Sequence, residues 1–188
     1  MKIILGSASK WRKGVIDTMG FEYEVMSPDI DEKAIRLRDP DKLVLALAEA
    51  KAKALLTKVK EPALIITGDQ VVVWNGQIRE KPQNEKEAGY FLESYCEHPA
   101  ETHSAVMVTN TANGKHAMGV DVARVYFKNI PKEIIDEVVK KGAIYTTAGG
   151  IQMEDALLAP YIERIDGTVD SLKGLPKALL TKLMEEVK

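Results

Sequence analysis

Short apolar runs alternate with amphipathic segments along the first part of the chain, a pattern typical of strands and helices that follow one another. Residues Lys2–Leu5 predict a short strand, and residues 11–19 predict a helix. Residues 21–25 alternate apolar and acidic side chains, which indicates a second strand. Asp39 before Pro40 is typical of a helix N-cap and first turn, so we expect a long amphipathic helix to begin there.

The middle of the chain is rich in strand signals. Asp69 lies at the break between two apolar runs, ALIIT and VVVW, and we expect these runs to form two separate strands. The second run leads into Asn75-Gly76, which is a strong hairpin signal. Asn84 is typical of a helix N-cap, and the pattern predicts a helix that extends to about Tyr95.

The last part of the chain combines a second hairpin with further helices. Strand-like runs at residues 102–110 and 120–127 flank the turn signal Asn113-Gly114, which favours a long antiparallel pair. Residues 131–141 predict a helix that ends at Gly142, and the segment TTAGGIQMED has no period and predicts a loop.

A C-terminal helix is expected from Pro176 onward. The order of elements predicts an α/β fold with a mixed, partly antiparallel sheet flanked by helices. The 188 residues lie in the size range of one domain, so we expect a single domain over residues 1–188.

Charge and composition limit the possible partners. The formal net charge is −2 and no dense basic run is present, which disfavours binding to duplex nucleic acid. No segment approaches the ~20 apolar residues of a membrane span, and the N-terminus lacks the pattern of a signal peptide. The single Cys96 cannot form an intramolecular disulfide. We therefore expect a soluble, cytoplasmic protein that does not bind membranes.

Four charged residues lie at predicted element ends or beside apolar segments, namely Glu32, Lys51, Asp69 and Lys81. Two carboxylates from separate segments can hold a divalent cation such as Mg²⁺ or Mn²⁺, and one carboxylate can accept a proton from an attacking water. The two lysines would supply positive charge for phosphate groups. The structural alternatives are a turn aspartate at Asp69, a solvated loop acid at Glu32 and a solvated helix lysine at Lys51. Lys81 is more informative, because it precedes Pro82 where the chain is rigid.

The opening LGSASKWRK predicts a strand, a turn of small residues and a helix, which together can aim backbone N–H groups at an anion. The Walker and dinucleotide-binding glycine motifs are absent. Residues 7–10 also fit the S-x-x-K motif of serine acylation, but its companion motifs S-D-N and K-T-G are missing. The three histidines lack zinc-ligand spacing. Trp11 can serve either as a core residue or as a platform for base stacking.

Seven motifs follow one another in the order LGSASKWRK, PDIDEK, LAEAKAKAL, TGDQVV, EKP, AGG and GLP. Over essentially its full length, the chain resembles the Maf-like nucleoside triphosphate pyrophosphatases, historically linked to inhibition of septum formation. The family's usual opening S-x-S-P-R-R reads S-A-S-K-W-R here, with Lys10 replacing the proline and Trp11 the first arginine. The resemblance implies a fold of the Maf and inosine-triphosphatase group and a homodimer.

The resemblance further implies hydrolysis between the α and β phosphates of a nucleoside triphosphate, with Mg²⁺ or Mn²⁺ as cofactor. It implies that Asp69 is the proton acceptor, that Asp69 and Glu32 hold the metal, and that Lys51 and Lys81 face the phosphates. The residues that it places on the phosphate-binding turn are Ser7, Ser9, Arg12 and Lys13.

Residues that face the base divide the family into subgroups. Trp11, Gln70 and Glu154 match the tryptophan, glutamine and glutamate of the N7-methylguanosine triphosphate subgroup, although Gln152 is an alternative to Glu154. An indole face would stabilise the positively charged methylated base, and a carboxylate would accept from its N–H groups. Two alternatives stay open: the same reaction on dTTP, UTP or CTP, and a non-catalytic nucleotide-binding regulator of cell division.

Overall fold

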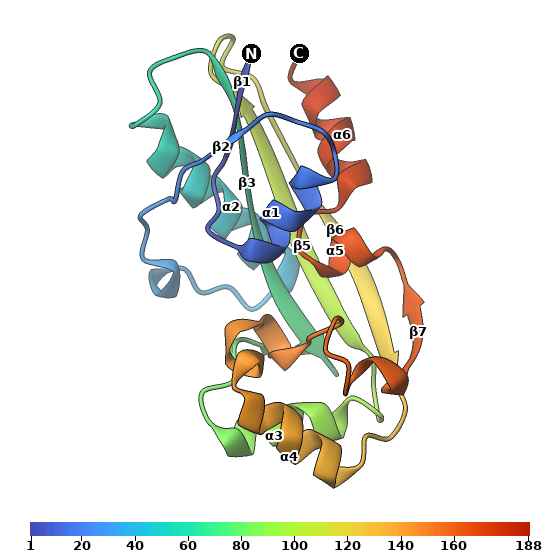
Figure 1. The fold of residues 1–188 in the computed structure, drawn as a ribbon. Helices are drawn as coiled ribbons and strands as arrows, with labels where there is room; N and C mark the ends of the chain where they lie inside the picture. Colours follow the sequence, from blue (N-terminus) through green and yellow to red (C-terminus); the bar gives the residue numbers. More distant parts are fainter. The chain divides into compact units, whose positions relative to one another are not determined.

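The computed structural model describes residues 1–188 (Figure 1). Its helices and strands, in chain order, are β1 (Lys2–Leu5), α1 (Lys10–Asp17), β2 (Glu24–Val25), η1 (Glu32–Ala34), α2 (Pro40–Leu56), β3 (Ala63–Trp74), β4 (Gln77–Arg79), α3 (Glu85–Ser94), β5 (Ala100–Asn110), β6 (His116–Phe127), α4 (Lys132–Lys141), η2 (Ala143–Thr146), η3 (Ala148–Gly150), η4 (Ala159–Tyr161), β7 (Ile162–Asp166), α5 (Val169–Leu172) and α6 (Lys177–Glu186). The elements labelled η are short 3₁₀ helices.

The strands form one seven-stranded sheet in the order β2-β1-β3-β5-β6-β7, with β4 also paired to β3. Strand β1 is parallel to both β2 and β3, whereas β4 is antiparallel to β3 and β7 is antiparallel to β6. The predicted α/β fold with a mixed, partly antiparallel sheet and flanking helices is therefore confirmed. None of the helices combines the length and the apolar character needed to cross a bilayer.

The chain divides into two compact units. The first comprises residues 1–70, 103–122 and 168–188, and the second comprises residues 71–102 and 123–167. Strands β3, β5 and β6 each contribute residues to both units. A single domain over residues 1–188 stays a prediction.

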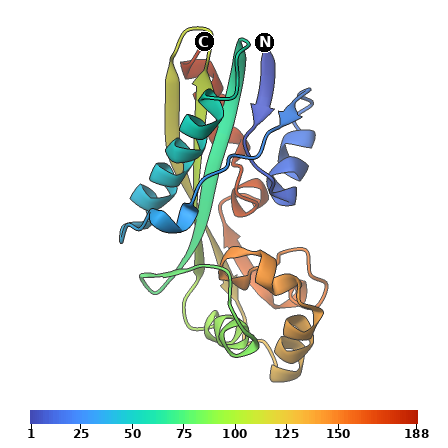
Figure 2. The same cartoon turned by 90° about the vertical axis from the view of Figure 1, so that its left-hand side faces the viewer.

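In the first unit, β3 presents opposite faces to different helices because successive side chains of a strand alternate. Leu64 and Ile66 belong to the buried cluster that includes Val15 of α1 and Leu180 of α6. Thr67 lies on the other face, where its hydroxyl donates to Ala48 O of α2 at 2.8 Å. Figure 2 shows α2 on one side of β3 and α1 on the other.

The core of the second unit contains a buried arginine surrounded by rings. Arg79 is only 4% exposed, and its guanidinium carbon lies 4.0 Å from the ring centroid of Trp74 and 4.5 Å from that of Phe91. Its Nη1 donates to Ser94 Oγ at 2.9 Å. These contacts join β4, the end of β3 and α3 into one packed group.

Most local signals are confirmed. Asp39 and Asn84 each accept a hydrogen bond as N-caps of α2 and α3. Asn75-Gly76 forms the hairpin turn between β3 and β4, with both residues at positive φ, as a type I′ turn requires. Gly142 ends α4 in the left-handed conformation.

Three expectations are wrong in detail. ALIIT and VVVW are not separate strands, because β3 runs unbroken through Asp69. The second strand spans only Glu24–Val25, and the segment TTAGGIQMED contains the 3₁₀ turn η3. Strand β7 and helix α5 were not predicted from the sequence, although Thr168 caps α5 and is a residue type that marks helix starts.

Candidate active site

Strand β1 ends before its neighbour β3, so one edge of β3 has no β1 partner beyond Ile66. Leu5 pairs with Ile66, and Gly6 N donates to Ile66 O at 2.7 Å, after which β3 continues alone on this side toward Asp69. Ligands in α/β sheets bind beyond the carboxyl ends of parallel strands. The strand end relevant to Asp69 is therefore that of β1, and not a break in β3 as the apolar pattern predicted.

The turn after β1 is built by serine hydroxyls. Ser9 is the N-cap of α1, and its Oγ accepts from Arg12 N at 3.4 Å. Ser7 Oγ accepts from Ser9 N and from Arg12 Nη1, each at 3.2 Å. Lys10 occupies the first helical position, where the family's proline would stand, so the cap forms without proline.

The Ser7 hydroxyl is not arranged as a nucleophile activated by Lys10. Its two partners are N–H donors, and Lys10 Nζ instead lies 4.6 Å from the ring centroid of Trp11. A lysine that activates a serine must be within hydrogen-bond reach of its oxygen. This arrangement argues against serine acylation.

Lys51 joins the two acids singled out in the sequence. Its Nζ lies 2.6 Å from Asp69 Oδ1 and 2.8 Å from Glu32 Oε1. The side chains of Lys51 and Asp69 are only 7% and 13% exposed, so water screens this pair weakly. Lys51 contacts Oδ1 of Asp69 and leaves the second carboxylate oxygen, Oδ2, available to a water or a cation.

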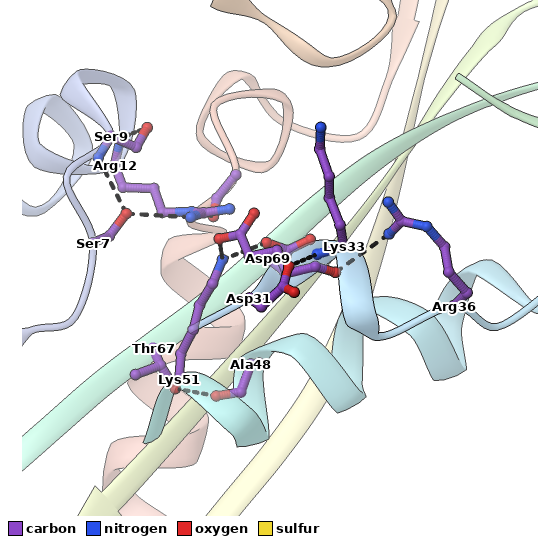
Figure 3. A network of polar contacts seen from close by, with 12 residues as sticks. Ser7, Ser9, Arg12, Asp31, Lys33, Arg36, Ala48, Lys51, Thr67 and Asp69 are labelled. Atoms are coloured by element: carbon purple, nitrogen blue, oxygen red, sulfur yellow. Dashed lines mark hydrogen bonds and ion pairs between the residues drawn. The ribbon is translucent and has the colours of Figure 1, made fainter. Parts of the chain in front are cut away.

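Side chains from three elements meet at this point. Figure 3 shows Arg12 of α1, Lys51 of α2 and Asp69 of β3 pointing toward one another. Burial lowers the pKa of the Arg12 guanidinium, whereas the charges of Asp69 and Glu32 raise it. The serine turn and the acid–lysine group are thus electrostatically coupled. Lys13 follows Arg12, but its side chain makes no hydrogen bond or ion pair with this group.

Two glycines of the quoted motifs allow close packing around the site. A Cβ on Gly68 would lie 2.5 Å from Ala105 O, so β3 and β5 can approach each other only because this residue has no side chain. A Cβ on Gly6 would lie 2.5 Å from Leu55 Cδ1 of α2. The glycine of TGDQ therefore allows the close approach of two backbones, and the glycine of LGS leaves room for the side chain of Leu55.

The paired carboxylates fit a hard divalent cation. Oxygen ligands suit Mg²⁺ or Mn²⁺, and Mg²⁺ typically takes only one or two carboxylates and completes its shell with water and phosphate oxygens. Glu32 and Asp69 are two such carboxylates, and each of them contacts the Lys51 ammonium in the structure. The structure contains no group of three or more His, Cys, Asp or Glu residues that would form an all-protein metal site.

Two of the expected base-reading residues lie in this first unit. Trp11 is half-buried on α1, and the approach of the Lys10 ammonium shows that its ring face can receive a cation. Gln70 Nε2 donates to Ser104 Oγ at 2.9 Å and to Leu172 O at 3.1 Å. Leu172 belongs to α5, which the sequence pattern did not predict.

The remaining expected residues belong to the second unit. Lys81 follows β4, and Gln152 and Glu154 follow η3. Gln152 is 7% exposed. The approach of these three residues to the cluster in the first unit stays a prediction.

Arg12 contacts the GLP motif near the C-terminus. Arg12 Nε donates to Gly174 O at 2.9 Å, which links the serine turn to the segment before α6. Gly174 is the first residue of the GLP motif, and its φ of +81° favours glycine. The contact of this motif with Arg12 forms only when the chain folds, so the spacing of the motifs does not predict it.

The fold and these contacts define an α/β protein with a serine-capped turn beside a lysine that contacts two acids. The model of the family described as Maf-like protein matches residues 2–187. The chain therefore belongs to the Maf-like family.

Two curated relatives match nearly the whole chain. A protein of Dictyostelium discoideum named 7-methyl-GTP pyrophosphatase is 43% identical over 192 residues, covering 98% of this chain and 96% of the relative. A dTTP/UTP pyrophosphatase of Clostridium perfringens is 30% identical, covering 98% and 96%. The crystal structure of a nucleoside-triphosphatase, or dITP/XTP pyrophosphatase, of Mycobacterium abscessus is 13% identical, with a TM-score of 0.39 over 70% of this chain and 76% of that one.

Proposed function

We propose that this protein is a nucleoside triphosphate pyrophosphatase that hydrolyses the α–β phosphoanhydride of N7-methylguanosine-type nucleotides. The observation that carries the proposal is the group in which Lys51 Nζ contacts both Asp69 and Glu32 beside the serine turn and Arg12. Family membership and the 43% identity to a 7-methyl-GTP pyrophosphatase support it.

In this mechanism, Asp69 accepts a proton from the water that attacks the α phosphorus. The bond from that phosphorus to the bridging oxygen breaks, and the products are a nucleoside monophosphate and pyrophosphate. Asp69 Oδ2 can take the proton while Oδ1 stays paired with Lys51. Arg12 and Lys51 offset the negative charge that develops on the leaving pyrophosphate, and we propose that Lys13 and Lys81 add to this charge.

We propose that Glu32 and Asp69 hold Mg²⁺ or Mn²⁺. When bound, the ion would polarise phosphate oxygens and neutralise part of their charge. Removal of divalent ions with a chelator should abolish pyrophosphate release, and an excess of Mg²⁺ or Mn²⁺ should restore it. Full activity in the chelator would contradict this assignment.

The experiment that tests the function is pyrophosphate release from a panel of nucleotides with Mg²⁺ or Mn²⁺. The panel contains N7-methylated GTP, GTP, ATP, dTTP, UTP and CTP. We expect N7-methylated GTP to have the highest kcat/KM. A strict preference for dTTP or UTP would instead support the activity named for the Clostridium perfringens relative.

An Asp69→Asn variant separates an enzyme from a non-catalytic regulator. Because the amide cannot accept the proton, we expect kcat to fall by about 10²- to 10⁴-fold while nucleotide binding is retained. Glu49→Gln is a matched control, since Glu49 is an acid of α2 that pairs with Lys53 outside the site. A wild-type protein that binds nucleotides without turnover would support the regulator.

We further propose a homodimer located in the cytoplasm, as the family resemblance implies. Size-exclusion chromatography with light scattering would test the dimer. A link to septum formation would require a division phenotype on deletion of the gene, and that phenotype should be absent in cells carrying only Asp69→Asn if turnover is not needed.

A further inference from the structure

The side-chain amide of Gln70 is held in one orientation. Its Nε2 lies 2.9 Å from Ser104 Oγ, 3.2 Å from Ser171 O and 3.1 Å from Leu172 O. Backbone carbonyls only accept hydrogen bonds, so the amide nitrogen must face them. Ser104 donates its single hydrogen to Ser171 O at 3.1 Å and can therefore only accept from Gln70. A flipped amide would place an oxygen against three acceptors.

This orientation makes Oε1 the polar atom that Gln70 can offer to a ligand. A Cβ on Gly174 would lie 3.3 Å from both Gln70 Oε1 and Arg12 Nε, so Oε1 lies on the side of Arg12. An amide oxygen only accepts hydrogen bonds. A base that meets Gln70 must therefore present an N–H group and not a ring nitrogen with a lone pair.

The turn that supplies the two carbonyls is anchored to the sheet. The Ser171 hydroxyl donates to the carboxylate of Asp121 on β6, and Ser171 N donates to Thr168 Oγ1 at 3.3 Å. Ser171 and Ser104 are fully buried. Further along the same segment, Gly174 O accepts from Arg12 Nε at 2.9 Å. One short segment, residues 168–174, thus fixes both the amide of Gln70 and the guanidinium of Arg12.

We propose that Asp121 and Ser171 are positioning residues that give this site its preference for bases with an N–H donor at the edge read by Gln70. This inference rests on the proposed function and on Gln70 as a base-reading residue. Guanine and N7-methylguanine carry N1–H there, and uracil carries N3–H. Adenine N1 and cytosine N3 are acceptors, and Gln70 Oε1 would repel them.

The test compares nucleotides of equal ring size that differ at this edge: N7-methylated GTP against ATP, and UTP against CTP. KM is measured for each nucleotide that the enzyme hydrolyses, and the inhibition constant is measured for each nucleotide that it does not hydrolyse. In Asp121→Ala and in Ser171→Ala, the amide should rotate more freely and offer Nε2 to acceptors. We expect the preference for the donor base to fall by about tenfold, through KM and with kcat within about twofold of wild type.

Three further variants make the result specific. Asp121→Asn retains an oxygen that can accept from Ser171 and should keep the wild-type preference. The double variant Asp121→Ala with Ser171→Ala should lose no more of the preference for the donor base than either single variant, because both changes remove the same hydrogen bond. Thr109→Val is the matched control, since Thr109 is also a buried residue of the sheet and its hydroxyl makes no hydrogen bond.

The possible failures are distinguishable. If the wild-type protein releases no pyrophosphate from any nucleotide, the proposed function is wrong and the inference falls with it. If the wild-type enzyme is active but Asp121→Ala keeps its preference, only the positioning role is overturned. If Asp121→Ala lowers kcat/KM equally for donor and acceptor bases, the positioning role is also overturned, because that result indicates general damage to the fold.

Discussion

Lys51 sets the charge of the site because it is buried and contacts two acids at once. Glu32 and Asp69 are balanced by Lys51 and Arg12, so the group carries no large net charge before a nucleotide binds. A triphosphate adds several negative charges. Positive charge from outside this group would offset these charges, which supports the proposed divalent cation and the proposed role of Lys81.

Trp11 provides the prediction at the residue scale. Replacing Trp11 with alanine should raise KM for N7-methylated GTP by about tenfold more than KM for GTP, because an indole face stabilises a cation by about 0.5–2 kcal/mol. Unmethylated GTP is the matched control, since it has the same size and hydrogen-bonding edge but no positive charge. An equal rise in both KM values would show that the ring acts only as an apolar surface.

At the scale of elements, the long strand β3 carries three consecutive residues with different tasks. Gly68 allows β5 to approach, Asp69 faces α2, and Gln70 faces the opposite side of the sheet toward α5. The alternation of side chains along a strand produces this separation. Asp69 and Gln70, the residue that we propose reads the base, are therefore adjacent in sequence but lie on different faces of the sheet.

A pair of glycine substitutions tests this arrangement. Gly68→Ala should lower the free energy of unfolding by about 1–3 kcal/mol, because its Cβ would meet Ala105 O. Gly14→Ala should raise it by about 0.5–1 kcal/mol, since Gly14 lies exposed within α1 and its Cβ would contact nothing within 4 Å.

Urea unfolding measures both changes, and pyrophosphate release shows their effect on the site. Gly68→Ala should also reduce kcat, because a shift of Asp69 by about 1 Å is enough to cost roughly 10²-fold. Gly14→Ala should keep wild-type kcat. Wild-type stability and activity in Gly68→Ala would show that β5 can move away without consequence.

At the scale of the whole molecule, the two compact units share three continuous strands. The backbones of β3, β5 and β6 each run without a break from one unit into the other. We therefore expect the units to unfold together. Such coupling is consistent with the single domain that the sequence predicts.

The two tryptophans allow a direct measurement, since Trp11 lies in the first unit and Trp74 in the second. The Trp74→Phe variant keeps only Trp11, which reports on the first unit, and the Trp11→Phe variant keeps only Trp74, which reports on the second unit. After correction for the stability of each variant by circular dichroism, the fluorescence and circular dichroism transitions should coincide. Two separate midpoints in one variant would show that the units unfold independently and that the chain has two domains.

Much of the fold could be predicted from local chemistry. Asp39, Asn84 and Gly142 were recognised as helix caps, and Asn75-Gly76 as a hairpin turn, because each acts on backbone groups only a few residues away. The continuity of β3 was missed because Gly68 and Asp69 interrupt its apolar pattern. Both residues are accommodated by distant partners, Ala105 and Lys51.

The sequence by itself determined most of the elements, the caps at Asp39, Asn84 and Gly142 and the resemblance to the family, and it identified Asp69, Glu32 and Lys51 as residues of interest. Only the tertiary structure decided that one ammonium contacts both acids, that Arg12 is tied to Gly174, and that Ser171 holds the amide of Gln70. The physical reason is the range of the interactions. Caps and turns form between near neighbours, whereas the site depends on side chains that the sheet brings together from separate segments.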